Sequence, residues 1–242
     1  LLPALVFLSL AVVPLAAHSA APGHDNARWV NPMIGTALSD APTLWGNYGG
    51  TYPGAVSPWG MVQLSPETST RPSEKGYYYS DKSILKFTCL GHSSGYPNGS
   101  AGSLDVIFMR GACSEIPSSY AGRASSHSAE EAQPGYYRVR FDDGDEVALT
   151  AATHAGIMKY STASATTTLV VCRGGAVSVV TPSEVHCERS HTVFTFSHPM
   201  TSYTLRGDTL YAQFDTRSPL EVRLSVSSSG FSQSIANGRA QL

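Results

Sequence analysis

The dominant pattern in this chain is an alternation of apolar and polar residues with a period of two, which begins near residue 104 and recurs to residue 226. Successive side chains of a β-strand point to opposite faces, so this period predicts strands with one buried face. The clearest examples are LDVIFM at 104–109, YYRVRF at 136–141 and LEVRLSV at 220–226. The pattern indicates an antiparallel sheet with one wet face.

One β-hairpin can be aligned residue by residue. A three-residue loop over 142–144 with Gly144 left-handed would connect two alternating runs. The expected cross-strand pairs are Val139 with Val147, Tyr137 with Leu149, and Arg140 with Glu146. The acidic DDGD of this loop lacks the later ligands of a calcium-binding loop, and a hairpin turn accounts for it fully.

The fold class follows from what accompanies these strands. No convincing amphipathic helix precedes residue 231, and strands do not alternate with helices, so a doubly wound or barrel α/β fold is excluded. We predict an all-β protein, an antiparallel β-sandwich over residues 22–230. The segment SQSIANGRAQL at 232–242 reads as the start of a helix, so we expect a linker helix to begin within 231–242.

The first 21 residues, LLPALVFLSLAVVPLAAHSAA, form a short apolar run that ends in small residues. This is typical of a secretory signal peptide, here without an initiator Met or basic region and so N-terminally incomplete. Pro3 and Pro14 interrupt the run, which argues against a transmembrane anchor. We expect an exported protein, periplasmic or extracellular, with no membrane span once the signal is removed.

The charge pattern argues against a nucleic-acid partner, and the cysteine spacing argues against a zinc or redox motif. Charged residues make up 14% of the 242-residue chain and the net charge is −2, with no basic stripe, so nucleic acid is not an expected partner. The spacing of Cys89, Cys113, Cys172 and Cys187 matches no zinc or redox motif. A bridge between Cys172 and Cys187 and buried free thiols both remain open.

The segment from Gly49 to Pro66, GGTYPGAVSPWGMVQLSP, is rich in glycine and proline, so we expect an ordered loop and no central strand. It carries Tyr52 and Trp59. An aromatic face on a stiff loop can present a flat apolar surface to a sugar ring. The alternative is a loop that covers the core and buries its aromatic side chains.

Two further patterns resemble catalytic motifs. The stretch from Gly91 to Gly95 satisfies G-x-S-x-G, the nucleophile elbow of α/β hydrolases, but YPNGS follows at 96–100 and no helix can begin there. A serine esterase with Ser93 as nucleophile is therefore a remote alternative. Glu130 and Glu131 are adjacent, so an extended strand would point them to opposite faces, which makes them a poor pair for glycoside hydrolysis.

An ordered set of longer motifs resembles one family. It comprises NPMIGT at 31–36, GGTYPGAVSPWGMVQLSPET at 49–68, GYYYSD at 76–81, EEAQPGYYRV at 130–139 and LTAATHAGIMKYS at 149–161. In this order they resemble the N-terminal domain of glycoside hydrolase family 92, which consists of secreted, calcium-dependent exo-α-mannosidases. The resemblance covers essentially the whole chain after the signal segment, and residues 234–242 are similar to the start of the family's linker helix.

The resemblance implies a β-sandwich packed on a helical (α/α) barrel, with the active site between the two domains. It places the general acid, the general base and most calcium contacts on the barrel, so no catalytic residue or metal ligand is assigned in this chain. By motif position, the residues expected to bind substrate are Gly49, Gly50, Thr51, Tyr52, Tyr79, Asp81, His92, Ser93, Gly95 and Tyr96.

The chain departs from the family at two places. LWGNYGGTYPGA and GHSSGYPNGSAG stand where many members have a His-rich stretch and a Thr-His-Leu-Ser-Gly stretch, which puts linkage specificity in question.

The expected function is the sugar-pocket domain of an exported mannosidase that hydrolyses terminal α-mannosides of glycans, for example α-1,2-linked ones, with inversion. The fragment alone would be inactive. The alternative is a stand-alone carbohydrate-binding β-sandwich.

Overall fold

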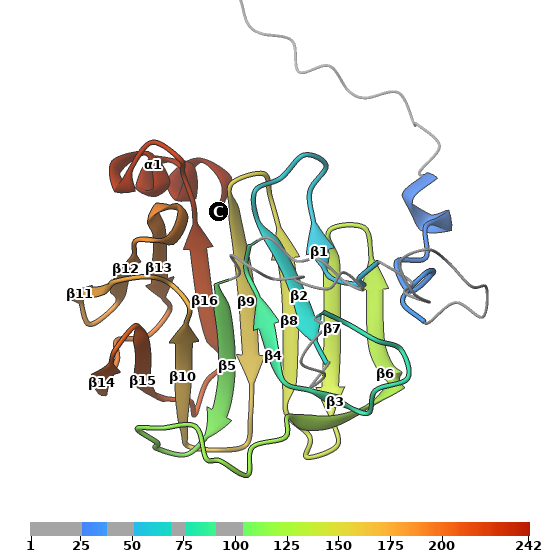
Figure 1. Ribbon diagram of the computed structural model, residues 1–242, viewed down its shortest axis with the longest axis horizontal. Coiled ribbons are helices and arrows are strands. Elements are labelled where there is room, and N and C mark those ends of the chain that lie inside the picture. The colour runs from blue at the N-terminus through green and yellow to red at the C-terminus, as the bar shows by residue number, and fades with distance from the viewer. Residues whose placement is uncertain (1–25, 38–50, 69–75, 91–103) are drawn as a thin grey trace, which may run out of the picture.

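A computed structural model of the chain describes residues 26–37, 51–68, 76–90 and 104–242. Two antiparallel sheets are stacked face to face, and a single α-helix within the described residues lies at one end of them (Figure 1). The expected all-β antiparallel sandwich is confirmed. Two short 3₁₀ turns, η1 (Asn26–Trp29) and η2 (Arg189–His191), complete the elements.

The first sheet has seven strands, in the order β1-β2-β4-β5-β10-β15-β14. Their bounds are β1 Ala55–Val56, β2 Gln63–Glu67, β4 Lys86–Thr88, β5 Asp105–Arg110, β10 Thr166–Cys172, β15 Thr209–Asp215 and β14 Ser202–Arg206.

The second sheet has nine strands, in the order β11-β12-β13-β16-β9-β8-β7-β6-β3. Their bounds are β11 Val177–Thr181, β12 Glu184–Cys187, β13 Thr192–Phe196, β16 Leu220–Ser225, β9 Ala155–Ser161, β8 Glu146–Ala151, β7 Tyr136–Phe141, β6 Arg123–Gln133 and β3 Ser83–Ile84.

The core lies between the sheets and is built from the alternate residues that the period-two pattern selects. Leu220, Val222 and Leu224 of β16 are all buried, whereas Arg223 between them is exposed. Such burial removes apolar surface from water and contributes about 25 cal/mol per Å². The alternation therefore identified the inner face of β16 correctly.

The predicted hairpin is confirmed in its register. β7 and β8 pair Val139 with Val147, Tyr137 with Leu149, and Arg140 with Glu146. Gly144 has a φ of 90°, in the left-handed region that favours glycine, and its N–H donates to Phe141 O at 2.9 Å.

The prediction that residues 49–66 contain no strand of a sheet interior is wrong at β2, which pairs with β1 on one side and β4 on the other. β1 is only two residues long and pairs with Gln63 and Leu64. Pro66 pairs only with Phe87 of β4, so its missing N–H faces no strand. The short neighbour makes the far half of β2 an edge strand, where proline is tolerated.

The expected C-terminal helix is present as α1 (Phe231–Gln241), which packs across β16, β13 and β9. Its buried Ser234 donates from Oγ to the carbonyl of His191 at 2.6 Å, and Asn237 donates from Nδ2 to Val226 O at 2.8 Å. Within the described ranges, no helix is long and apolar enough to cross a membrane.

The four cysteines are free thiols, so the suggested bridge between Cys172 and Cys187 is not formed. Cys187 lies in the core between the sheets, whereas Cys172 ends β10 of the other sheet, with Sγ 3.9 Å from the carbonyl oxygen of Asp105. The two residues therefore belong to different sheets. Burial raises the pKa of Cys187 to about 12, so this thiol is inert as a nucleophile.

Candidate functional site

Two of the predicted substrate-binding segments meet on the turn formed by the NPMIGT motif. Thr51 donates from Oγ1 to the carbonyl of Ile34 at 2.9 Å, and the N–H of Tyr79 donates to the carbonyl of Thr36 at 3.1 Å. Segments far apart in the sequence are thus fixed to one turn. The other predicted residues, Gly49, Gly50, His92, Ser93, Gly95 and Tyr96, lie outside the described residues.

The three consecutive tyrosines of GYYYSD have different environments. Tyr77 and Tyr78 are buried, whereas Tyr79 is 43% exposed. Asp81, two residues later, is half-buried, and its Oδ2 accepts a hydrogen bond from Thr68 Oγ1 at 2.9 Å. Thr68 Oγ1 in turn accepts from the N–H of Tyr78 at 2.9 Å. The chain therefore holds an exposed aromatic ring close in sequence to an oriented carboxylate.

A buried polar cluster lies behind Tyr79. The His127 ring is stacked on the Tyr79 ring, with centroids 3.8 Å apart and 9° between the planes. His127 Nδ1 lies 2.8 Å from Glu130 Oε1, and Glu130 also accepts hydrogen bonds from the hydroxyls of Tyr77, at 3.0 and 3.1 Å, and Tyr137, at 2.7 Å. Burial, followed by the charge of Glu130, raises the pKa of Tyr77, so its hydroxyl stays a donor.

The sequence did not single out His127. Glu130 and Glu131 do point to opposite faces, with side chains 2% and 40% exposed. The predicted opposite orientation of the two side chains is confirmed. The available signal was that Glu130 opens the EEAQPGYYRV motif and that a histidine precedes it by three residues.

The loop between β1 and β2 presents Trp59, which is 99% exposed. The alternative that this loop buries its aromatic side chains is therefore wrong for Trp59. Its φ of 61° is unusual for a bulky residue, and the flanking backbone fixes it, with Gly60 N–H bonded to Ser57 O at 2.9 Å and Met61 N–H to Thr153 O at 2.7 Å. Tyr52 is half-buried, and burial raises its pKa.

Gly54, in the same motif, is required by a close approach of two backbone segments. A Cβ at this position would lie 2.3 Å from Leu64 O and 2.4 Å from Ser65 Cβ. We expect Gly54→Ala to destabilise the fold by about 3 kcal/mol, since overpacking typically costs about 1–3 kcal/mol. The midpoint of thermal unfolding should fall by about 6–12 °C.

The matched control is Gly207→Ala, in the turn between β14 and β15, where a Cβ meets nothing within 4 Å. Its φ of 60° makes alanine mildly unfavourable, so a loss of only about 1 kcal/mol is expected. Equal melting temperatures for the two variants would show that the approach at Gly54 is not tight.

The described residues offer no metal centre. Within 26–37, 51–68, 76–90 and 104–242, no group of three or more His, Cys, Asp or Glu side chains is placed to hold an ion. We therefore assign no calcium ligand to these residues.

Comparison with known proteins shows the family to which the chain belongs. Residues 29–222 match the profile described as the Glycosyl hydrolase family 92 N-terminal domain. The chain belongs to glycosyl hydrolase family 92. The match includes the turn at 31–36, the tyrosines and the His127 cluster. A comparison with curated protein sequences gave no match.

Several solved structures share the fold of this family 92 domain. An inverting mannosidase of the family from Bacteroides thetaiotaomicron, BT2199, aligns over 89% of this chain and 33% of its own, with 24% identity and a TM-score of 0.70. The α-mannosidase BT3965 from the same bacterium aligns over 88% and 35%, with 20% identity and a TM-score of 0.68. The family glycosyl hydrolase ccman5 aligns over 89% and 34%, with 20% identity and a TM-score of 0.72. The chain spans about a third of the length of these proteins.

Proposed function

We propose that this chain is the sugar-pocket domain of an exported, exo-acting α-mannosidase that releases terminal mannose from glycans with inversion. The catalytic acid and base, and most contacts to a calcium ion, belong in this proposal to an (α/α) barrel domain that packs on the sandwich. The observation that carries the proposal is the family match over residues 29–222, supported by the mannosidases that share the fold.

In this proposal the described residues bind and orient the sugar. The exposed Tyr79 ring offers an apolar surface for one face of a pyranose. Asp81, whose Oδ2 is oriented by Thr68, accepts hydrogen bonds from sugar hydroxyls. Inverting hydrolysis needs an acid and a base about 6.5–9.5 Å apart, and the two adjacent glutamates of β6 cannot supply that pair.

The second candidate is a stand-alone carbohydrate-binding module, which needs no barrel. The exposure of Trp59 and Tyr79 favours it, since aromatic rings alone can bind a sugar. Hydrolysis of an α-mannoside by a longer protein that includes the barrel distinguishes the two candidates.

We expect the 242-residue chain to show no turnover of an aryl α-mannoside, because no catalytic acid and base are assigned to it. A longer protein that includes the barrel should hydrolyse the same substrate, release β-mannose first by proton NMR, and lose activity with a calcium chelator. Turnover by the purified chain would contradict this division of roles. Mannoside binding without activity in the longest natural product of the gene would favour the binding module.

A further inference from the structure

An irregular stretch of β6 carries His127. β6 and β7 pair Ser125 with Phe141 and then Glu130 with Val139, so residues 126–129 face only Arg140. Such bulges re-aim side chains and concentrate beside functional sites. Here the bulge lets His127 lie flat against Tyr79 while Glu130, at the point where pairing resumes, turns inward.

The contacts of His127 indicate which of its ring nitrogens carries a hydrogen. Its Nε2 contacts the carbonyl oxygen of Tyr79, which can only accept, so Nε2 carries a hydrogen. Its Nδ1 lies 2.8 Å from Glu130 Oε1 and 3.2 Å from the Tyr77 hydroxyl, which itself donates to Glu130. Glu130 and Tyr77 therefore fix the orientation of the His127 ring through Nδ1.

His127 therefore contacts Tyr79 in two ways, at its backbone carbonyl and at its ring. The His127 Nε2–H donates to the Tyr79 carbonyl, and the imidazole ring is stacked parallel on the Tyr79 ring. Because His127 covers one face of the Tyr79 ring, only the opposite face is left to stack on a ligand, and the residue as a whole is 43% exposed.

We propose that His127 and Glu130 are positioning residues that hold Tyr79 as a stacking platform for a pyranose ring. The identity of the ligand rests on the function proposed above, whereas the positioning itself does not. Glu130 orients the His127 ring through Nδ1, and His127 fixes both the backbone and the ring of Tyr79.

The ionisable groups around His127 come from three segments. Glu130 belongs to the same strand, Tyr137 comes from β7, and Tyr77 and Tyr79 come from the stretch before β3. Removing the Glu130 carboxylate would take away the contact that orients the His127 ring, so Tyr79 should be held less tightly.

The first test is ¹⁵N NMR of the histidine side chains in the 242-residue chain. We expect Nε2 of His127 to carry a hydrogen, and a nuclear Overhauser contact between the His127 and Tyr79 rings. Glu130→Gln should weaken that ring contact. An Nε2 without a hydrogen, or no contact between the two rings in the unmodified chain, would overturn the proposal, whatever the enzymatic activity.

The second test is kinetic, with an aryl α-mannoside and the longer protein. We expect His127→Ala and the conservative Glu130→Gln to raise KM about tenfold with kcat within about twofold, as loss of a substrate-binding contact does. His127→Phe keeps a ring to stack on Tyr79 and should raise KM less than His127→Ala.

His186→Ala is the matched control. His186 lies 2.8 Å from Glu184 and is stacked on Phe231 with 18° between the rings, but it belongs to β12, far across the nine-stranded sheet from β6 (Figure 1). It should lower the melting temperature and leave KM unchanged. Equal KM effects at His186 and His127, or a loss confined to kcat, would reduce His127 to a structural role. If the longer protein has no mannosidase activity, the proposed function fails, and the NMR result still decides the positioning pair.

Discussion

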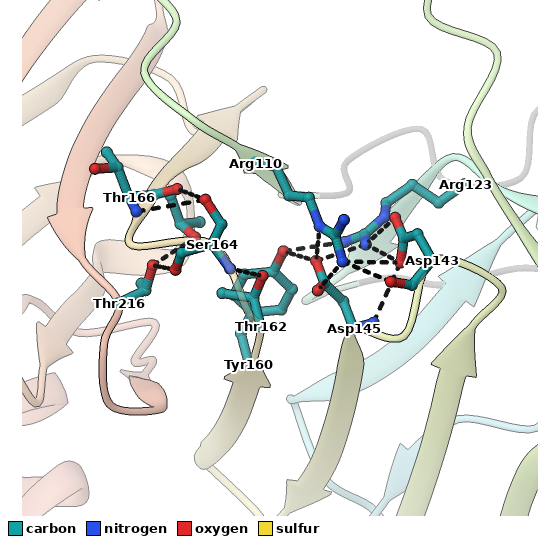
Figure 2. A network of polar contacts seen from close by, with 10 residues as sticks. Arg110, Arg123, Asp143, Asp145, Tyr160, Thr162, Ser164, Thr166 and Thr216 are labelled. Carbon is teal, nitrogen blue, oxygen red and sulfur yellow. Dashed lines mark hydrogen bonds and ion pairs between the residues drawn. The ribbon is translucent and has the colours of Figure 1, made fainter.

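Replacing Asp145 with alanine should lower the free energy of unfolding by about 3–5 kcal/mol, the usual cost of leaving buried ionic partners uncompensated. Figure 2 shows Asp145 between Arg110 and Arg123, with Tyr160 and Thr162 beside it. Its carboxylate is fully buried and accepts from Arg110 Nη2 at 2.5 Å and Arg123 Nη2 at 2.6 Å. The Tyr160 hydroxyl also donates to it.

The network explains why the loss should be large. Arg123 is only 12% exposed, and without Asp145 its remaining acidic partner is Asp143, which is 40% exposed. Arg110 comes from β5 of one sheet, whereas Asp145 precedes β8 of the other. The carboxylate therefore ties the two sheets together at one end of the sandwich.

The effect should depend on pH. Burial alone would raise the pKa of Asp145, but hydrogen bonds from Arg110, Tyr160, Thr162 and Arg123 outweigh it and hold the pKa below its ordinary value. A depressed pKa stabilises the folded state above the unfolded value of about 3.9 and loses that contribution as the pH falls through the folded value. The difference between the unmodified chain and Asp145→Ala should thus be constant near neutrality and shrink below about pH 4.

Urea denaturation at several pH values measures this difference. Asp142→Ala is the control, since Asp142 is an exposed residue of the neighbouring hairpin loop and should change stability by less than about 0.5 kcal/mol. An Asp145→Ala variant within 1 kcal/mol of the unmodified chain would show that the buried pair contributes little.

The second large effect is expected at Asp81. In the longer, active protein, Asp81→Asn should lower kcat/KM for an aryl α-mannoside by about 10- to 100-fold, because hydrogen bonds to a charged group contribute about 1.5–3 kcal/mol. Asparagine keeps a side-chain oxygen that can accept from Thr68 Oγ1, so the fold should be retained. Asp142→Asn makes the same chemical change in the hairpin loop and should have no effect. Unchanged kinetics in folded Asp81→Asn would remove Asp81 from the sugar pocket.

The sequence predicted the regular part of the fold because a period-two pattern reports burial directly. The hairpin register followed from pairing apolar with apolar residues and from Gly144. β2 was missed because proline and glycine counts describe local propensity, whereas the one-sided pairing at Pro66 depends on the length of β1. The free state of Cys172 and Cys187 was likewise undecidable, since it depends on the separation and direction of the two side chains in the folded chain.

The candidate site could be read from the sequence only in part, because some of its contacts join segments that lie far apart in the chain. Motif order named Thr51 and Tyr79 as substrate-binding residues, which stays a prediction, but it did not show that the turn at 31–36 is bonded to both of them. His127 comes from a bulge 48 residues after Tyr79, and no local pattern links the two. Contacts of this kind arise from strand register and become visible only in three dimensions.

The most direct test of the account is a crystal structure of the longer protein with a non-hydrolysable α-mannoside analogue. We expect the sugar between the sandwich and the barrel, with one face against the exposed side of Tyr79 and a hydroxyl within hydrogen-bonding distance of the Asp81 carboxylate. A sugar bound by the barrel alone, with Tyr79 and Asp81 away from it, would contradict the account.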